Sequence, residues 1–338
     1  MQKELLFAAL ARMGLMQSGD TPEVIALTGG VSSDIVRVAL PGRVLCVKQA
    51  LPKLKVTADW QAPVERSRFE MNWLQTVASI LPDAVPQVLG EDVEAGMFAM
   101  QFLDPVEYPV WKEQLRDGNI SLATAVEVGR RMGAIHRATA GDARIAAMFA
   151  TDHIFFPIRL EPYLSATAAK HPDCANRLQS LVRITGASKK ALVHGDISPK
   201  NILAGPRGPV FLDAECAWYG DPAFDLAFCL NHLLLKCASR PQWQTRYLEC
   251  YDALANAYLA SVNWESPADI ECRTAHLLPG LLLGRIDGRS PVEYLTQEGE
   301  REAVRHVARS LLLEPVATLA AIRHQWVTQR KAMDRNPA

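Results

Sequence analysis

The chain has 338 residues, of which 49% are hydrophobic and 22% are charged, and its formal net charge is -1. This length suits two domains, or one large bilobal domain, with a well-filled core. The near-neutral charge gives no reason to expect nucleic acid or an anionic membrane as a partner. The seven cysteines show no CxxC spacing, which argues against a disulfide framework or a zinc site and favours a reducing cytoplasm. No apolar stretch reaches the length of a membrane span.

The N-terminal third of the chain carries strand patterns. Residues 1–16 show apolar positions at helical spacing, and strand-like runs follow at 24–27, 35–39 and 44–49, with a Pro-Gly turn between the last two. The loop between the first two strands consists of small residues that would let backbone amides approach a phosphate closely. Its candidate nucleotide-binding residues are Gly29, Gly30, Ser32 and Ser33. A Gly-Gly turn that only joins two strands is the alternative interpretation.

Lys48 lies on the third of these strands and shares a face with Cys46. A helix predicted at 62–80 offers it a partner, because a strand lysine and a glutamate of the next helix form the ion pair that aims the lysine at nucleotide phosphates. We prefer Glu70 to Glu65 as this partner, since Glu70 lies deeper in the helix beside apolar residues. The alternative is a solvated surface lysine.

Two further strand-like runs complete the N-terminal part, and helical patterns dominate after Asp104. We therefore predict an N-lobe at residues 1–103 that covers the nucleotide and a C-lobe at residues 104–338. The linker between them, predicted at residues 100–103, would present backbone groups to the edge of an adenine ring. Met100 and Phe102 are the predicted contacts.

The helix predicted at 122–140 has one continuous face, formed by Leu122, Val126, Gly129, Gly133 and His136. The two glycines allow close packing against another element, and the histidine is interpreted as a satisfied core residue. Residues 151–186 are poorly informative. Asp225 lies in the first turn of a later helix, where a carboxylate can accept backbone amides, and is interpreted as structural. Further helices are predicted at 240–262, 267–283 and 301–330, the last with a break at a proline.

The segment at 191–203 carries a His-Gly-Asp sequence between two short apolar runs, which predict buried strands around a loop. Asp196 can receive a hydroxyl proton, and Asn201 follows on the same loop. Asp213 and Glu215 come at the end of the next strand, and because they are two apart both side chains are predicted to leave one face of it. A cation would relieve their repulsion. Asn201 and these two acids are therefore the predicted magnesium ligands on ATP.

These residues resemble the catalytic loop of the kinase-fold small-molecule phosphotransferases, a group that includes aminoglycoside phosphotransferases, choline kinases and methylthioribose kinases. The Asp-x-Glu form at 213–215, the run at 47–52, and Ala217-Trp-Tyr-Gly220 with Phe224-Asp225 are most similar to the methylthioribose kinases. The resemblance covers residues 24–300. It implies an α+β, protein-kinase-like bilobal fold with an antiparallel sheet in the N-lobe and a mainly helical C-lobe. ATP and Mg²⁺ are the implied cofactors.

The resemblance also implies the role of each residue. Asp196 is the catalytic base, and Lys48, aimed by Glu70, holds the α- and β-phosphates of ATP. Asn201 and Asp213 bind magnesium, and Glu215 assists at the metal.

The acceptor is left open by these motifs. Methylthioribose kinases carry a substrate-binding arginine pair near the C-terminus, whereas the run Leu283-Gly-Arg-Ile-Asp-Gly-Arg289 offers an arginine preceded by glycine. Arg285, Asp287 and Arg289 are the candidates for acceptor contacts, with an exposed, salt-bridged turn as the alternative.

We expect a cytoplasmic, ATP-dependent kinase that phosphorylates a hydroxyl of a small polar metabolite, sugar-like in character. One alternative is an aminoglycoside- or choline-type kinase of the same fold. Another is a nucleotide-binding pseudokinase that acts as an interaction module. The sequence leaves open whether GTP replaces ATP and whether the chain forms a homodimer.

Overall fold

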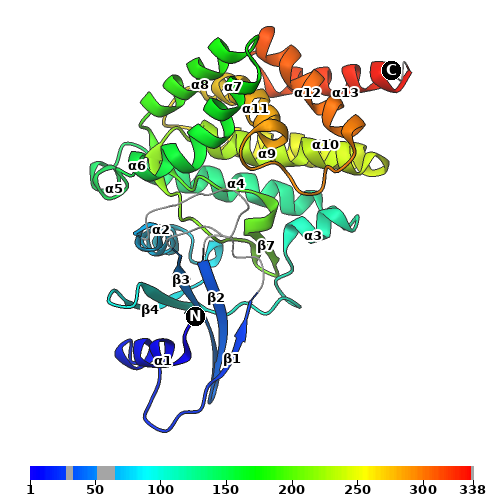
Figure 1. Cartoon of the computed structure of the whole chain (residues 1–338). Coiled ribbons are helices and arrows are strands. Elements are labelled where there is room, and N and C mark those ends of the chain that lie inside the picture. Colours follow the sequence, from blue (N-terminus) through cyan, green and yellow to red (C-terminus); the bar gives the residue numbers. More distant parts are fainter. Residues whose placement is uncertain (28–32, 52–64, 336–338) are drawn as a thin grey trace.

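The computed structural model describes residues 1–27, 33–51 and 65–335. Figure 1 shows an antiparallel sheet at one end of the molecule and a larger, mainly helical part at the other. The predicted α+β fold class is confirmed. The boundary predicted between residues 103 and 104 falls between the last strand of the sheet and the first helix of the C-terminal part, and the division into two domains stays a prediction.

The N-terminal sheet holds five of the described strands, in the order β1-β2-β3-β5-β4, with every neighbouring pair antiparallel. The strands and the two helices that accompany them are β1 (Glu23–Ala26), β2 (Ser33–Leu40), β3 (Arg43–Ala50), β4 (Val88–Asp92), β5 (Met97–Gln101), α1 (Lys3–Arg12) and α2 (Arg66–Ile80). The predicted hairpin of β2 and β3 is present, since Leu40 pairs with Arg43 across the Pro-Gly turn. Gly42 in this turn has a φ of 75°, a conformation that glycine adopts without steric cost.

The two faces of the sheet are covered by different helices, because successive side chains of a strand point to opposite faces. On one face Leu6 of α1 and Val47 of β3 belong to a single apolar cluster. On the other face Cys46 belongs to the main core, which includes Trp73 of α2 and continues into the helical part. Lys48 is buried beside Glu70 of α2, so the solvated-lysine alternative is wrong.

The C-terminal part consists of helices with two short antiparallel strand pairs. Its longer α-helices are α4 (Leu122–Thr139), α8 (Ala175–Ala187), α9 (Ala223–Ser239), α10 (Gln244–Leu259), α11 (Pro267–Asp287), α12 (Glu298–Leu313) and α13 (Leu319–Arg335). The shorter helical segments of the chain are η1 (Pro82–Ala84), α3 (Trp111–Arg116), α5 (Ala143–Met148), α6 (Asp152–Phe155), the π-helix η2 (Phe156–Ser165), α7 (Ala166–Lys170), η3 (Pro199–Asn201) and η4 (Pro241–Trp243). The strand pairs are β6 (Ala191–Val193) with β9 (Trp218–Gly220), and β7 (Ile202–Gly205) with β8 (Gly208–Phe211).

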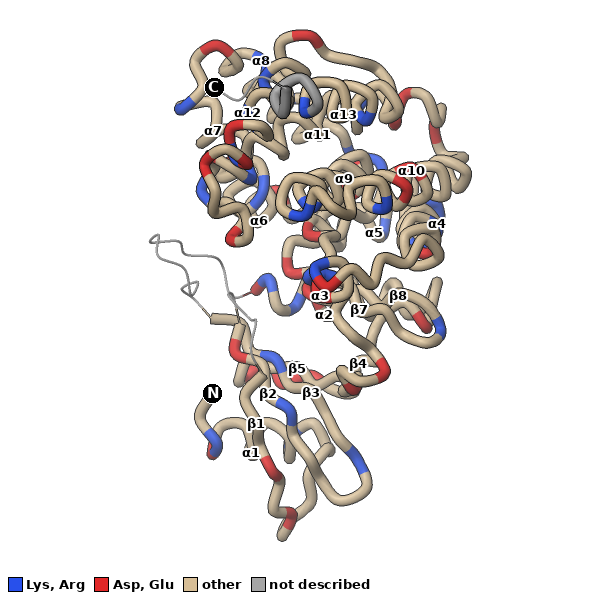
Figure 2. Tube along the Cα trace, turned by 90° about the vertical axis from the view of Figure 1, so that its right-hand side faces the viewer, with Lys and Arg blue, Asp and Glu red and all other residues tan. Residues whose placement is uncertain are grey.

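Helix α9 lies at the centre of the helical part, because each of its 17 residues is buried. Helices α10, α11 and α12 pack against it. The helices predicted at 240–262, 267–283 and 301–330 correspond to α10, α11 and the pair α12 and α13. Basic and acidic residues are interspersed along the described chain in both parts (Figure 2). No helix within the described ranges is long and apolar enough to cross a membrane.

Helices α4 and α10 pack closely through glycine. A Cβ atom at Gly129 would lie 2.3 Å from the carbonyl oxygen of Leu254, and one at Gly133 would lie 2.6 Å from a side chain that follows α10. The predicted close packing is therefore confirmed. The predicted buried face is wrong at its N-terminal end, where Leu122 and Val126 are exposed, because α4 buries neighbouring positions of its first two turns instead.

Candidate active site

The loop that carries Asp196 is anchored by a carboxylate of helix α9. Asp225, which is fully buried, accepts hydrogen bonds from the backbone N–H groups of His194 (2.7 Å) and Gly195 (2.8 Å). Gly195 has a φ of 80°, and a Cβ atom there would lie 2.7 Å from a backbone oxygen of the loop after β8, so only glycine fits. Asp225 therefore accepts hydrogen bonds from backbone amides, as predicted. His136 is a buried core histidine, as predicted, and its Nε2 lies 3.2 Å from Oδ2 of Asp225.

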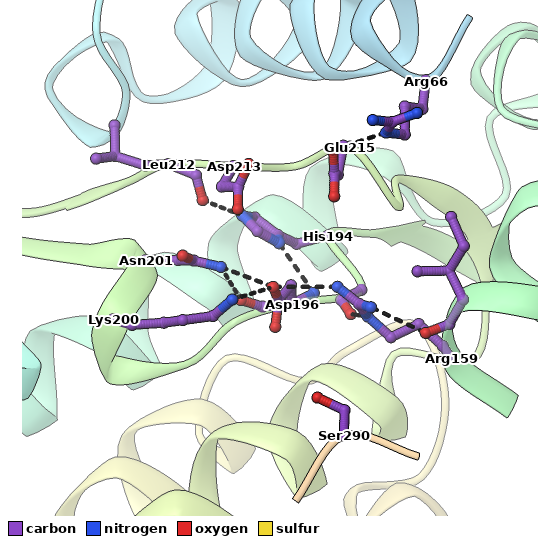
Figure 3. Close-up of polar contacts among 12 residues, drawn as sticks. Arg66, Arg159, His194, Asp196, Lys200, Asn201, Leu212, Asp213, Glu215 and Ser290 are labelled. Atoms are coloured by element: carbon purple, nitrogen blue, oxygen red, sulfur yellow. Dashed lines mark hydrogen bonds and ion pairs between the residues drawn. The ribbon is translucent and has the colours of Figure 1, made fainter. Parts of the chain in front are cut away.

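Asp196 is buried, and the side chains that contact its carboxylate in the described part of the chain all use Oδ2. These are Nδ2 of Asn201 (2.9 Å), Nη2 of Arg159 (3.0 Å) and Nζ of Lys200 (3.2 Å), as Figure 3 shows. Burial raises the pKa of the Asp196 carboxyl, but Lys200 and Arg159 outweigh burial and hold that pKa below its usual value. The carboxylate is therefore ionised at neutral pH, and its Oδ1 atom is not engaged by the described residues.

Arg159 is a site residue that the sequence did not predict. It lies on the π-helix η2, where its Nε donates to the carbonyl oxygen of Gly195 and its Nη1 donates to that of Ile158 (2.9 Å). π-Helical turns occur often at functional sites. The signal available in the sequence was a lone charge in the apolar run 154–160, because an arginine buried among apolar residues needs an anionic or carbonyl partner.

Lys48 links the N-terminal sheet to the loop after β8. Its Nζ lies 2.7 Å from Oε2 of Glu70 and also contacts Oδ1 of Asp213, which is 165 positions away in the sequence. The predicted ion pair with Glu70 is confirmed, and Glu65 instead lies 2.9 Å from His153. Burial raises the pKa of Glu70 to about 7 against the effect of Lys48. Burial also disfavours the ammonium form of Lys48, but Asp213 and Glu70 reverse this effect and raise its pKa, so the lysine is charged.

The two acids after β8 do not lie on a strand. Strand β8 ends at Phe211, and Asp213 has a φ of 68°, in the left-handed region that aspartate tolerates better than most residues. The predicted common strand face for Asp213 and Glu215 is therefore wrong, because the backbone turns between them. Each acid has its own protein cation: Lys48 contacts Asp213, and Nε of Arg66 lies 3.0 Å from Oε2 of Glu215. Protein cations thus relieve the repulsion that the sequence suggested a metal ion must relieve.

The residues predicted to bind magnesium offer suitable oxygen atoms. Nδ2 of Asn201 donates to both the carboxylate (2.9 Å) and the backbone carbonyl (3.0 Å) of Asp196, which leaves its amide oxygen for another partner. Lys48 contacts one oxygen of Asp213, which leaves the second. Carboxylate and amide oxygens suit Mg²⁺, which usually takes few protein ligands and keeps waters and phosphate oxygens. The described residues hold no cluster of three or more His, Cys, Asp or Glu side chains that could hold a metal ion.

The predicted nucleotide-contacting residues are only partly described. Outside the described residues lie Gly29, Gly30 and Ser32. Ser33 is buried at the start of β2, and Met100 lies within β5 opposite Cys46, so the predicted linker begins after this strand and not at Met100. Phe102 follows the strand, with the guanidinium of Arg37 located 5.5 Å from the centre of its ring. Nucleotide contacts of Ser33, Met100 and Phe102 stay predictions.

The three residues predicted to contact the acceptor have different partners. Arg285 is buried and lines a cavity together with Lys200 of the Asp196 loop. Asp287 is paired with Arg305 (2.8 Å), and Arg289 is paired with a glutamate of η2 (2.7 Å). The cavity position suits an acceptor contact for Arg285. The alternative of an exposed, salt-bridged turn describes Arg289, whereas Asp287 is salt-bridged but ends α11 and is largely buried.

This fold, with a lysine of the sheet paired to a glutamate of α2 beside an Asp–Asn loop of the helical part, defines the class of kinase-fold phosphotransferases. Residues 23–270 match the family described as APH, phosphotransferase enzyme family, and the chain belongs to this family.

Two relatives illustrate the similarity in sequence. The chain is 26% identical over 230 residues to the methylthioribose kinase of Escherichia coli O45:K1 (strain S88 / ExPEC), a match that covers 60% of this chain and 54% of that protein. It is 25% identical over 224 residues to methylthioribose kinase 2 of Oryza sativa subsp. japonica, covering 56% of this chain and 51% of that protein. The chain thus spans about half the length of the curated relatives it matches.

Two solved structures share the fold. A spectinomycin phosphotransferase, APH(9)-Ia, in complex with ADP and spectinomycin has a TM-score of 0.54 at 12% identity, covering 98% of this chain and 99% of that chain. An ethanolamine kinase of Plasmodium vivax has a TM-score of 0.53 at 12% identity, covering 95% of this chain and 84% of that chain. At these identities the likeness shows the fold alone.

Proposed function

We propose that this chain is an ATP-dependent kinase that phosphorylates a hydroxyl group of a small polar metabolite, sugar-like in character. The observation that carries the proposal is the geometry at Asp196, whose Oδ2 is held by three donors while its Oδ1 is not engaged by the described residues. Lys48 and Asp213 bring phosphate- and metal-binding groups to the same site. Family membership supports the reaction, and similarity to proteins named methylthioribose kinase supports a sugar-like acceptor.

Asp196 acts as the base in this proposal. The acceptor oxygen forms a bond to the γ-phosphorus, and the bond from that phosphorus to the β-phosphate oxygen breaks, so that ADP leaves. The hydroxyl proton passes to Oδ1 of Asp196. Because its pKa is held low, Asp196 takes the proton late, once bonding to phosphorus has made the hydroxyl acidic. Arg159 and Lys200 fix the carboxylate before the acceptor binds, which lowers the entropic cost of alignment.

In this proposal, residues from both parts of the chain bind the phosphates of ATP. Glu70 directs Lys48 toward the α- and β-phosphates. Asn201 and Asp213 would hold magnesium, which when bound neutralises charge on the phosphates. Glu215, which would assist at the metal, is paired with Arg66.

The charges near the site disfavour a cationic acceptor of the aminoglycoside or choline type. The cavity that Lys200 lines is also lined by Lys112, Lys236 and Arg285. Among the described residues, Glu293 is the one acidic residue in this lining. A cationic ligand would meet like charges there. We also place the protein in a reducing cytoplasm, because its seven cysteines are all free thiols.

The experiment that tests the proposal measures ADP formation from Mg-ATP by the full chain. The acceptors are methylthioribose, other pentoses, choline and aminoglycosides. Asp196→Asn is expected to fold and to bind Mg-ATP, but to lose about 10²–10⁴-fold in turnover because the general base is gone. Asp269→Asn, at an exposed position in the first turn of α11, is the matched control and should keep wild-type turnover.

Near-normal turnover by Asp196→Asn would contradict the role assigned to this residue. A wild-type chain that fails to bind Mg-ATP would contradict the kinase proposal itself and leave the pseudokinase alternative without support as well.

A further inference from the structure

A cavity lies beside the Asp196 loop. It encloses about 280 Å³ of space, including its opening to solvent. Its polar lining comes from α3, the Asp196 loop, α9, α11 and the segment after α11, and includes Lys112, Lys200, Lys236, Arg285, Glu293 and Tyr294. In Figure 3, Ser290, a hydrogen-bond partner of Arg285, lies on the opposite side of Asp196 from Asp213. Because Lys200 lines the cavity and its Nζ lies 3.2 Å from Oδ2 of Asp196, the cavity adjoins the catalytic base.

The cavity carries more positive than negative charge. Glu293, its acid among the described residues, is paired with Lys112. Nζ of Lys200 lies 3.2 Å from the carboxylate of the catalytic base. The two remaining cations, Lys236 and Arg285, form no ion pair with any residue in the described ranges.

Lys236 is a buried cation whose side chain is only 3% exposed. Its Nζ lies 3.8 Å from the centre of the Tyr294 ring, and no described residue accepts a hydrogen bond from it. An ammonium ion held in this way is costly unless it finds an anion. Burial, with a contribution from Lys112, lowers the pKa of Lys236 to about 8, so the side chain remains mostly charged at neutral pH. It offers a desolvated positive charge to a ligand.

Arg285 is likewise buried, and its described partners are neutral. Its Nη1 donates to the carbonyl oxygen (2.5 Å) and hydroxyl (3.1 Å) of Ser290 and to the hydroxyl of Tyr163 (3.2 Å). Its Nε is buried without a hydrogen-bond partner among the described residues. Burial and the charge of Arg285 hold the pKa of His232 well below its usual value, so this neighbour stays neutral. The arginine therefore has no carboxylate in direct contact among the described residues, and the acid of the cavity, Glu293, is paired with Lys112.

We infer that this cavity binds an anionic group of the acceptor, a carboxylate or a phosphate, while the hydroxyl to be phosphorylated reaches Asp196. The inference rests on the proposed function and narrows its acceptor to a hydroxyl compound that carries a negative charge. Arginine and lysine pair with either anion through charge-assisted hydrogen bonds. Because Lys200 both lines the cavity and contacts Asp196, the anion and the reacting hydroxyl belong to one small molecule.

The test measures binding by isothermal titration calorimetry to the full chain saturated with Mg-ADP. Two matched pairs of probes are used: D-glycerate with glycerol, and ribose 5-phosphate with ribose. We expect the anionic member of at least one pair to bind about 10- to 100-fold more tightly than its neutral partner, because hydrogen bonds to a charged group contribute on this scale. A preference in the first pair identifies a carboxylate, and one in the second identifies a phosphate. No preference in either pair overturns the inference.

Variants locate the origin of the preference. Lys236→Met is expected to abolish it and to leave the affinity for Mg-ADP unchanged. Lys170→Met, which changes an exposed lysine at the end of α7, is the matched control and should keep the preference. A preference that survives both Lys236→Met and Arg285→Met would show that the anion binds elsewhere.

The outcomes separate this inference from the proposed function. A chain that binds Mg-ADP and phosphorylates neutral acceptors better than anionic ones keeps the proposed function and refutes the inference alone. A chain that binds no Mg-ADP refutes both.

Discussion

A buried lysine without a carboxylate partner, as at position 236, works against folding. Burial lowers the pKa of Lys236 from 10.5 to about 8. In the unfolded chain the side chain keeps its ordinary pKa, so between these two values the unfolded state binds more protons than the native state. Stability therefore rises with pH across this window, and the full penalty is present below it. A residue that destabilises the native state at neutral pH and lines a cavity is the kind expected of a binding site and not of a structural core.

Lys236→Met should accordingly stabilise the protein at neutral pH. We expect the free energy of unfolding to rise by on the order of 2 kcal/mol at about pH 7, since each unit of pKa shift corresponds to about 1.4 kcal/mol. The gain should shrink as the pH approaches 10.5, the ordinary pKa of the lysine. Urea unfolding at both pH values measures it, with Lys170→Met as the control. A loss of stability at neutral pH would show that the ammonium ion has a stabilising partner.

The sequence predicted those site residues whose partners are near in sequence or are set by strand and helix geometry. Asp196 and Asn201 share one loop, and Lys48 with Glu70 follows from a strand and the next helix. It did not predict Arg159, because this residue reaches the loop from a π-helix whose irregular turn no periodic pattern reveals. A cation that is distant in sequence becomes visible as a partner only when the chain is folded.

At the scale of elements, the close approach of α4 to α10 depends on the absence of a side chain at Gly129. A Cβ atom there would lie 2.3 Å from the Leu254 carbonyl oxygen, which is part of the helix backbone and has no rotamer with which to move away. The glycines on the predicted face at 122–140 indicated this approach. The sequence predicted neither the exposed positions at the start of α4 nor the backbone turn at Asp213. Both depend on which other elements pack against those residues in the folded chain.

Gly129→Ala should push the two helices apart. We expect a loss of about 1–3 kcal/mol in the free energy of unfolding, the usual cost of overpacking. Gly299→Ala is the matched control, because a Cβ atom at this exposed position in α12 meets nothing within 4 Å, and alanine favours helix by up to about 1 kcal/mol over glycine. Urea unfolding of both variants makes the comparison. Equal effects of the two substitutions would contradict the close helix contact.

At the scale of the whole molecule, charged contacts join the N-terminal sheet and α2 to the loop after β8. Lys48 reaches Asp213, and Arg66 reaches Glu215, across 165 and 149 positions of sequence respectively. The site is therefore assembled from two regions that each carry only part of it. Burial makes both contacts sensitive to the removal of one partner, because the charge left behind has lost its solvent as well as its counterion.

Lys48→Met removes the ammonium ion that Glu70 and Asp213 share. Two carboxylates then remain near each other in a partly buried site, so we expect the free energy of unfolding to fall by about 3–5 kcal/mol at about pH 8. Burial already raises the pKa of Glu70 to about 7, and Lys48 lowers it. Without the lysine, the pKa of Glu70 therefore rises further. A carboxyl group whose pKa is higher in the native state than in the unfolded state stabilises the native state fully at pH values below its unfolded pKa, here 4.5. This contribution is lost as the pH rises through the native pKa.

The deficit of Lys48→Met relative to wild type should therefore be smaller at about pH 5.5 than at about pH 8, because a proton on Glu70 partly replaces the missing positive charge. Urea unfolding in magnesium-free buffer at the two pH values measures the difference. Arg144→Met, which breaks an exposed ion pair with Asp142, should change stability little at either pH. A deficit of the same size at both pH values would mean that Glu70 is ionised throughout, and that the shared lysine is not what sets its protonation.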